Sequence, residues 1–375
     1  MNILSITILL IVAMGAAWGL AFALSEAARR AALRWGVLSP VTPRSSHRVP
    51  TPRLGGVGLA LGFGLGAFFF LAALRFFVDH PPALFAGGPR LLTWAALGWL
   101  TMFVVGLLDD LLDLPALLKL ALQTLAVLAP AWGGGILLTF HPPLGPQGPA
   151  LALFCVALTM LWLLFFANGY NFMDGMDGFA AGFARSSALF MFAIVLVAGG
   201  RAGTLGDLRA GVLLLPILAA ACGGFLRLNR SPARVFMGDA GSLSVGYLLA
   251  IAVVLGRRGD FGVRLPLVSS LTVLLPFIFD VLLTMARRAR MGQNLLKAHR
   301  EHLYQRLMRS GLSHGEVLRI NHVCFGLCGL AALLGAASGA AVGRWAGLAL
   351  ALAVMAGYWR LTLRREALAQ RTKRT

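Results

Sequence analysis

The segment LLTWAALGWLTMFVVGLLDDLLDLPALLKLALQTLAVLAPAW, residues 91–132, contains two long apolar runs with three aspartates between them. A helix needs roughly 20 apolar residues to cross the hydrocarbon core of a bilayer. Residues 91–108 and 114–132 approach that length, so we interpret them as two membrane helices joined by a short acidic connection.

Similar apolar runs recur along the whole chain of 375 residues, of which 58% are hydrophobic and 13% are charged. A soluble domain usually carries about 25% charged residues. The composition therefore excludes a soluble enzyme, a secreted disulfide scaffold and a disordered tail. We expect one all-α domain, residues 1–375, that forms a polytopic integral membrane protein with about 10–11 transmembrane helices. The expected helices are residues 3–24, 54–77, 91–108, 114–132, 150–167, 178–199, 208–226, 240–256, 264–286, 320–341 and 345–361.

Basic residues are unevenly distributed among the connecting segments. The chain carries 33 Lys and Arg against 14 Asp and Glu, a formal net charge of +19. A nucleic-acid-binding domain would gather these residues on one polar surface. Here they stand in short runs between apolar segments, so we predict no nucleic-acid partner. Most of them fall on the cytoplasmic side if the N-terminus is outside and the C-terminus is cytoplasmic, and we predict that orientation.

Small residues inside the apolar runs suggest how the helices pack. Gly58, Gly62 and Gly66 are four residues apart, which places them on one face of a helix. Such a face lets a neighbouring helix approach closely; a lipid-binding groove is the alternative. Four cysteines without CxxC spacing are interpreted as small membrane-helix residues: Cys155, Cys222, Cys324 and Cys328.

Three aspartates mark the connection between the first two runs. Asp109, Asp110 and Asp113 lie within about one helical turn, so in a helix all three would point roughly to one side. Ionisable groups at membrane depth are costly and by default mark a site. Adjacent carboxylates suit a hard divalent cation such as Mg²⁺, and Lys119 would neutralise a phosphate. A solvated acidic loop is the alternative.

A second acidic motif is FFANGYNFMDGMDGFAAG, residues 165–182. Asn168, Asn171, Asp174 and Asp177 recur at every third position, which predicts four oxygen-bearing side chains in a row along a helix end or tight loop. An ordinary Asn/Asp/Gly turn is the alternative.

The motif RVFMGDAGS, residues 234–242, contributes Asp239 just ahead of another expected helix. Asp239 would bind a ligand there or cap that helix. The free amides of the helix end would also suit a phosphate.

The longest connection, residues 287–319, is a basic loop in which we expect a short amphipathic helix. It contains KAHREHLYQRL, residues 297–307, and follows an arginine cluster. Two histidines three residues apart are weak evidence for a metal, so we favour an anion site, with an ordinary positive-inside loop as the alternative. The residues concerned are His299, Arg300, His302, Arg287, Arg288 and Arg290.

Taken together, these motifs resemble the polyprenyl-phosphate N-acetylhexosamine-1-phosphate transferases, glycosyltransferase family 4. The resemblance extends from HRVPTPRLGGVGL, residues 47–59, through the three acidic motifs to HREHLYQRL. It implies a bacterial inner-membrane enzyme that transfers a sugar 1-phosphate from a UDP-sugar to undecaprenyl phosphate and releases UMP. It also implies Mg²⁺, with Mn²⁺ as an alternative, an active site facing the cytoplasm, and the lipid bilayer as a partner.

The resemblance assigns roles by position. Asp109 and Asp110 resemble the catalytic pair, one of them being the base or nucleophile, and a direct transfer and an aspartyl-phosphate route both stay open. Asn171 and Asp239 resemble the magnesium-binding positions. We assign substrate binding to Lys119, Asn168, Asp174, Asp177, His299, Arg300 and His302, and a supporting role to Asp113, His47, Arg287, Arg288 and Arg290.

Three alternatives concern the function. The run His-Arg-Glu-His departs from the consecutive histidines of the phospho-N-acetylmuramoyl-pentapeptide translocase, so it favours the enzymes that begin O-antigen, lipopolysaccharide or capsule chains. That translocase is the second candidate. A secondary transporter is the candidate from another class, but transporters usually show repeated halves and none is visible here. The sugar and the oligomeric state, with a homodimer as one alternative, stay open.

Overall fold

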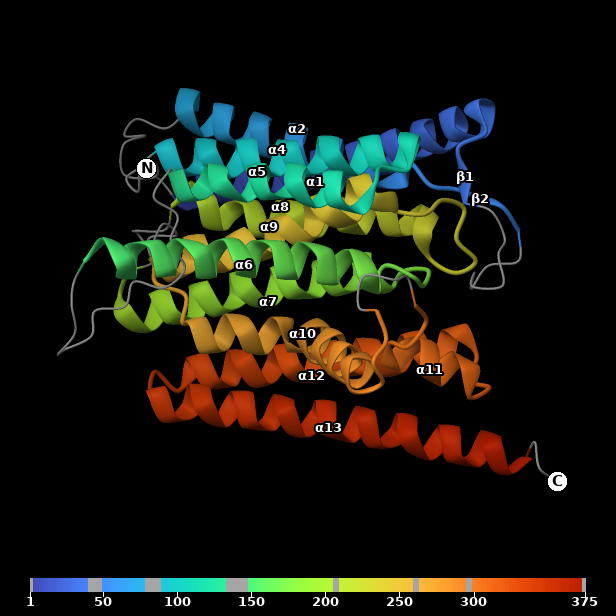
Figure 1. Ribbon diagram of the computed structural model, residues 1–375. Coiled ribbons are helices and arrows are strands. Elements are labelled where there is room, and N and C mark those ends of the chain that lie inside the picture. Colours follow the sequence, from blue (N-terminus) through green and yellow to red (C-terminus); the bar gives the residue numbers. More distant parts are fainter. Residues whose placement is uncertain are drawn as a thin grey trace.

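The computed structural model describes residues 3–39, 49–77, 89–132, 148–204, 209–258, 263–294 and 299–372. Within these residues the chain is a bundle of long helices with one two-stranded sheet (Figure 1). Ten of the described helices are long and apolar enough to cross a membrane. The expectation of an all-α polytopic membrane protein is confirmed, while the orientation of the termini stays a prediction.

The helices follow the apolar runs of the sequence, and several extend past them. The expected membrane helix 114–132 corresponds to α5, which has 17 residues and is shorter than the ten candidate spans. The bounds are α1 Ile3–Trp35, α2 Gly55–Phe77, α4 Pro89–Leu112, α5 Ala116–Trp132, α6 Pro149–Met173, α7 Phe179–Ala202, α8 Ala210–Asn229, α9 Gly238–Arg258, α10 Leu267–Arg290, α11 Leu303–Arg309, α12 His314–Ala337 and α13 Ala341–Thr372.

Expected and observed ends differ most at α1, α6 and α13, and in the basic loop. A count of apolar residues stops at the first charges, whereas the helical backbone continues for as long as its own hydrogen bonds are favourable. About half of the expected loop 287–319 is helical. It contains the end of α10, the start of α12 and, between them, the short helix α11 that the sequence predicted.

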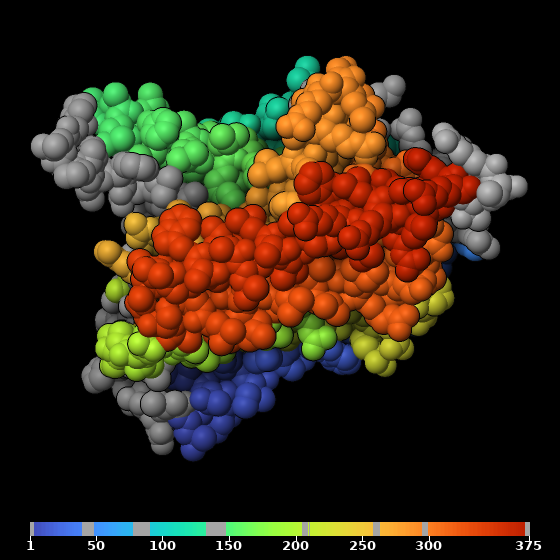
Figure 2. Space-filling model, turned by 90° about the horizontal axis from the view of Figure 1, so that it is seen from below, coloured from blue at the N-terminus to red at the C-terminus, as the bar shows by residue number. Residues whose placement is uncertain are grey.

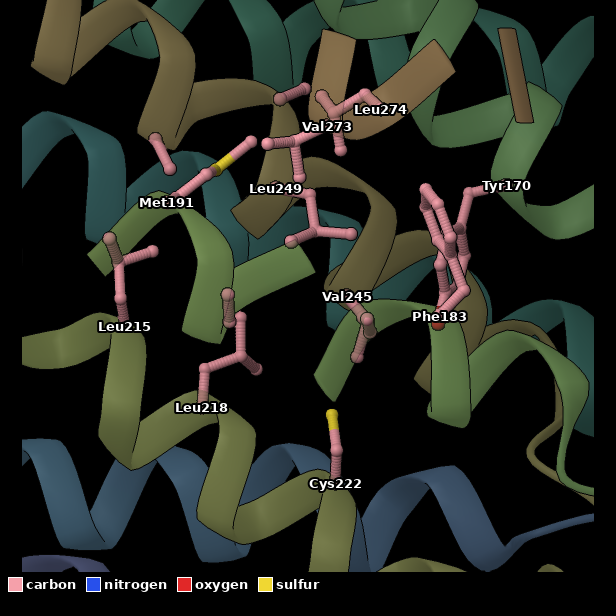
Figure 3. Packing of buried hydrophobic residues seen from close by; sticks show 14 of the residues in the cluster. Tyr170, Phe183, Met191, Leu215, Leu218, Cys222, Val245, Leu249, Val273 and Leu274 are labelled. Atoms are coloured by element: carbon pink, nitrogen blue, oxygen red, sulfur yellow. The ribbon is translucent and has the colours of Figure 1, made fainter. Parts of the chain in front are cut away.

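The centre of the bundle is α9, because 83% of the residues in its apolar stretch are buried inside the protein. It packs against α4, α6 and α2. Apolar side chains of α9 pack together with those of α6, α7, α8 and α10 (Figure 3). All four cysteines are free and buried, as expected for small helix residues.

The predicted glycine face of α2 packs against α1. A Cβ added at Gly58 would collide with the backbone of Ser25, and one added at Gly62 would lie 2.5 Å from Ala21 N. At Gly66 it would lie 2.7 Å from Ala17 Cβ. The contact of small residues along both helices confirms the packing interpretation.

We expect Gly62→Ala to lower the free energy of unfolding by about 1–3 kcal/mol, because the added methyl group must displace the backbone of α1. Thermal unfolding of the protein in detergent measures the effect as a lower Tm. The matched control is Gly19→Ala on α1, where an added Cβ meets no atom within 4 Å. Equal Tm values for the two variants would contradict the close approach of α1 and α2.

A small sheet and its extension join the start of α2 to the start of α9. Strands β1 (Leu38–Ser39) and β2 (Thr51–Pro52) are antiparallel, with Ser39 opposite Thr51. The chain beyond β2 then pairs with the segment before α9: Phe236 N donates to Pro52 O at 2.8 Å, and Gly56 N donates to Met237 O at 2.8 Å. These bonds fix the place where α9 begins, which becomes one wall of the site.

Candidate active site

Three charged side chains from three helices meet at one end of the bundle, which we call the acidic end. Asp109 lies near the end of α4, Lys119 near the start of α5, and Asp239 in the first turn of α9. Lys119 Nζ lies 3.0 Å from Asp109 Oδ2 and also forms an ion pair with Asp239. Each of these side chains keeps about a fifth of its surface exposed, at 19%, 18% and 24%, so a ligand can reach them.

Asp110 has a different role from its neighbour. Its side chain is buried, and its two carboxylate oxygens accept hydrogen bonds from Asp239 N at 3.0 Å and Ala240 N at 2.9 Å. Asp110 therefore caps the N-terminus of α9 from another helix. The cap that the sequence suggested for Asp239 belongs to Asp110, and the side chain of Asp239 is left for Lys119.

Asp113 does not join the other two aspartates, and the expectation that all three share one side is wrong. α4 ends at Leu112, and Asp113 has a φ of 48°, in the left-handed region. Its side chain is 81% exposed and lies 3.3 Å from Arg53 Nη2. The helical spacing on which the expectation depended stops one residue before Asp113.

Two asparagines of α6 connect that helix to its neighbours at the acidic end. Asn171 Nδ2 donates to Ser242 Oγ at 2.7 Å, in the second turn of α9. One turn earlier, Asn168 Nδ2 donates to Leu164 O at 3.0 Å and to Gln123 Oε1 at 2.8 Å. A carbonyl can only accept, so Leu164 O fixes which way the Asn168 amide faces.

Gln123 is a site residue that our reading of the sequence missed. It is 1% exposed and holds Asn168. It follows Lys119 by four residues on α5, so the two share a helix face. That spacing is the signal that could have found it.

The two aspartates after α6 face different surroundings. Asp174 is the C-cap residue of α6, and burial raises its pKa to about 8, with the carboxylates of Asp239, Asp110 and Asp177 adding to the effect. Asp177 Oδ2 instead accepts a hydrogen bond from Ala233 N at 3.0 Å. The expected row of four side chains is therefore wrong for Asp177, because α6 ends at Met173 and the chain turns.

The segment KAHREHLYQRL, residues 297–307, which we call the histidine motif, is built around a buried carboxylate of α10. Asp280 Oδ1 lies 3.0 Å from His302 Nδ1, and the Asp280 carboxylate accepts Leu303 N at 3.0 and 3.1 Å. His302 and Asp280 are each 1% exposed. Asp280 therefore fixes His302, the N-cap residue of α11, in place.

The histidine motif lies next to the motif 165–182. Tyr304 stacks on His302 with ring centroids 6.2 Å apart. A Cβ added at Gly175 would collide with Tyr304 Oη. The glycine thus allows the turn after α6 to contact α11, and two motifs far apart in the sequence form one wall.

The arginines of the basic segment lie in different places. Arg288 is buried, with Nη1 3.5 Å from Glu301 Oε1 and Nη2 donating to Asn294 O at 2.6 Å. Arg287 and Arg300 are half-buried, and Arg290 is exposed at the end of α10. His47, to which we assigned a supporting role, lies outside the described residues.

His299 stands beside His302, with ring centroids 4.9 Å apart. Burial lowers the pKa of His299 to about 4, and the nearby charges of His302 and Arg288 add to this effect. Glu301 and Asp280 oppose it without reversing it. The ring is therefore neutral at physiological pH.

We expect the folded state to lose stability as the pH falls from about 6.5, the usual histidine pKa, towards the pKa of about 4 that His299 has in the folded protein. Between these values the unfolded chain binds the proton more tightly, so stability present above pH 6.5 is lost. The effect is on the order of 1–2 kcal/mol after allowance for solvent screening.

The measurement is Tm against pH for wild type and His299→Gln in detergent. The variant is expected to lose less Tm between pH 7.5 and pH 4.5. Parallel curves would show that His299 is protonated equally well in both states. At pH 7.5 the histidine is neutral in both states, so the comparison there reports only the change of side chain.

The oxygen donors at the acidic end are few. Within the described ranges, no three His, Cys, Asp or Glu side chains are grouped so as to hold a metal by themselves. Asp239 lies in the first turn of α9, and Asn171 contacts the second turn through its amide nitrogen, which donates to Ser242 Oγ. The carbonyl oxygen of the Asn171 side chain is left to bind a metal ion. Mg²⁺ is commonly bound by one or two side chains with the remaining ligands from substrate phosphates and water. Asp239 and Asn171 fit that mode.

Comparison with known proteins identifies a common family. The family described as "Glycosyl transferase family 4" matches residues 92–257. A decaprenyl-phosphate N-acetylglucosaminephosphotransferase of Mycobacterium tuberculosis is 32% identical over 323 residues, which cover 80% of this chain and 76% of that protein. An undecaprenyl-phosphate alpha-N-acetylglucosaminyl 1-phosphate transferase of Yersinia pestis is 24% identical, covering 82% and 79%. A phospho-N-acetylmuramoyl-pentapeptide-transferase of Pelotomaculum thermopropionicum is 32% identical over 240 residues, covering 61% and 69%.

Proposed function

This chain belongs to glycosyl transferase family 4, and we propose that it transfers an N-acetylhexosamine 1-phosphate from a UDP-sugar to undecaprenyl phosphate, with release of UMP. The reaction would take place at the cytoplasmic face of the bacterial inner membrane. The observation that carries the proposal is the meeting of Asp109 and Asp239 at Lys119. A nucleoside diphosphate needs a cation and acid–base groups of this kind close together.

The lipid and sugar parts of the proposal are supported by the relatives. The Mycobacterium tuberculosis and Yersinia pestis proteins are named for N-acetylglucosamine phosphate transfer to polyprenyl phosphates. The pentapeptide-transferase covers less of this chain, and the run His299-Arg300-Glu301-His302 differs from consecutive histidines. We therefore propose an N-acetylhexosamine without a peptide, as in enzymes that begin O-antigen or related cell-envelope polymers.

We propose Mg²⁺ as the cofactor, with Mn²⁺ as an alternative. Asp239 and Asn171 would hold it, and the diphosphate would complete its ligands. When bound, the ion neutralises charge on the diphosphate and polarises the reacting phosphorus.

Asp109 is the carboxylate that we propose as the general base. Asp110 uses both oxygens to cap α9, so we assign to it the positioning of Asp239 and not a contact with substrate. Asp109 lies at the accessible side, where Lys119 holds one of its oxygens. An Asp109 that accepts a proton from the lipid phosphate would make that phosphate a better nucleophile.

In the direct route the bonds change as follows. An oxygen of the lipid phosphate forms a bond to the phosphorus attached to the sugar. The bond from this phosphorus to the bridging oxygen breaks, UMP leaves with that oxygen, and the proton of the lipid phosphate passes to Asp109. An aspartyl-phosphate route would use the same carboxylate as the nucleophile.

Lys119 and the segment His299–His302, which we call the histidine wall, would bind the phosphates and the nucleotide. Lys119 is a compact charge between two carboxylates, and phosphate binding there would replace part of its ion pairing. His302 is fixed by Asp280, and Arg300 stands beside it in the same segment. A guanidinium offers paired donors to phosphate oxygens.

The test is UMP release by the purified, folded protein supplied with undecaprenyl phosphate, Mg²⁺ and a panel of UDP-N-acetylhexosamines. We expect release with at least one UDP-sugar and none without the lipid. Failure with every sugar would contradict the proposal. Release only with UDP-MurNAc-pentapeptide would identify the translocase activity, and uptake into proteoliposomes without chemical change would indicate a transporter.

A further inference from the structure

We infer that Glu366, near the end of α13, is a positioning residue that holds α11, and with it His302, in place at the site. The inference rests on the proposed function for its catalytic consequence. Its structural basis is the ion pair between Glu366 and Arg306 of α11. Arg306 Nε donates to Glu366 Oε1 at 2.8 Å, and Arg306 Nη2 donates to Glu366 Oε2 at 2.6 Å.

The geometry of this pair is that of a specific link. Both carboxylate oxygens meet the guanidinium, which fixes the direction of the two side chains as well as their distance. The Arg306 side chain is 5% exposed and the Glu366 side chain 28%. A buried arginine needs such a partner, because an unpaired charge in that position is strongly unfavourable.

α11 depends on contacts outside itself for its position. It has seven residues, far fewer than an isolated helix needs to be stable in water. Its start is held by Asp280, which accepts the amide of Leu303. Its following turn carries Arg306, so Glu366 provides a second, independent attachment. Two attachments determine both the place and the orientation of a short helix.

The apolar side of α11 does not replace this link. Leu303 and Leu307 are fully buried and hold the helix against the bundle, but apolar packing is non-directional. The partner for the polar side comes from α13, which lies with α12 along one face of the molecule (Figure 2). The last turns of α13, beyond the apolar part of the helix, therefore contact α11.

The consequence falls on His302, the N-cap residue of α11. His302 precedes Arg306 by four residues, and the turn containing Gly175 packs against Tyr304 between them. A shift of α11 would displace the histidine wall without touching Asp109 or Asp239. Loss of the pair should thus weaken nucleotide-sugar binding more than it affects the acidic end.

The first test compares kinetics of full-length wild type, Glu366→Gln and the control Glu316→Gln. Glu316 belongs to the exposed capping box of α12, where its side chain is hydrogen-bonded to Ser313. Among the described residues, no side-chain hydrogen bond joins Glu316 to α11. We expect the KM for the UDP-sugar to rise about 10–100-fold in Glu366→Gln, with little change in the KM for undecaprenyl phosphate. Equal KM values in the two variants would overturn the inference.

A charge exchange tests the pair itself. Arg306→Glu alone is expected to behave like Glu366→Gln or worse, and the double variant Arg306→Glu/Glu366→Arg is expected to recover part of the UDP-sugar KM. A double variant as impaired as the sum of its single changes would overturn the link.

Hydrogen–deuterium exchange of residues 303–309 provides a readout that does not depend on activity. We expect faster amide exchange in Glu366→Gln than in wild type or Glu316→Gln at a temperature where all three are folded. If wild type released no UMP, the proposed function would fail, and the exchange experiment would still test the attachment. If wild type were active and exchange in α11 were unchanged, the inference alone would fail.

Discussion

Asp109→Asn is expected to lower the rate of UMP release by about 10²–10⁴-fold, which is the usual contribution of a general base. Asparagine keeps the shape of the side chain but cannot accept the proton of the lipid phosphate. The hydrogen bond from Leu114 N to Asp109 Oδ1, at 3.1 Å, can persist. The variant should therefore fold, and the loss should appear in kcat. Steady-state UMP release with saturating substrates measures it.

Two neighbouring aspartates are the matched controls for this experiment. Asp113→Asn removes a carboxylate that is exposed and paired with Arg53, and it should leave kcat within a few-fold of wild type. Asp110→Asn replaces one of the two oxygens that accept from the start of α9 by an NH2 group and leaves one N–H without its acceptor, so it should also lower the free energy of unfolding by about 1–3 kcal/mol. Near-normal kcat in Asp109→Asn would exclude Asp109 as the base. A loss confined to Asp110→Asn would transfer that role to Asp110.

Asp239→Ala is expected to reduce Mg²⁺-dependent UMP release by at least about 10²-fold, because both a proposed metal ligand and the partner of Lys119 are removed. We also expect the Mg²⁺ concentration for half-maximal rate to rise about 10–100-fold. The measurement is a Mg²⁺ titration of the initial rate, preceded by removal of bound metal with a chelator. The wild type should lose activity on chelation and regain it with Mg²⁺.

The titration separates the roles of the two carboxylates. Higher Mg²⁺ should recover part of the activity of Asp239→Ala but none of the activity lost in Asp109→Asn. Asp113→Ala again serves as the control, since the Asp113 side chain is exposed and paired with Arg53. Unchanged Mg²⁺ dependence in Asp239→Ala would remove this residue from the proposed metal site.

The sequence predicted the helices well because their cause is local. An apolar run of roughly 20 residues has only one stable way to cross a bilayer, with its backbone groups bonded within the segment. The predicted glycine face was also correct, because the spacing of Gly58, Gly62 and Gly66 is a property of a single helix. The predicted helix ends were less accurate, since the change from apolar to polar residues does not show at which residue a helix ends.

The three aspartates at the end of α4 show why the site could be predicted only in part. Their sequence indicated acidic chemistry at this place. Their separate surroundings depend on what packs against them: Asp109 meets Lys119, Asp110 meets the amides of α9, and Asp113 turns outward. Lys119, the amides of α9 and Arg53, the partner of Asp113, all lie outside α4, so no local pattern contains them.

The sequence by itself determined that this protein is an all-α membrane protein, which motifs carry its chemistry, and the family to which it belongs. These follow from hydropathy and from residue types in order along the chain. Only the tertiary structure decided that Asp110 caps α9, that Gln123 holds Asn168, and that Asp280 fixes His302. The physical reason is that hydrogen bonds and ion pairs between side chains act over a few Å. Which residues come that close is set by the packing of whole helices, not by their spacing in the sequence.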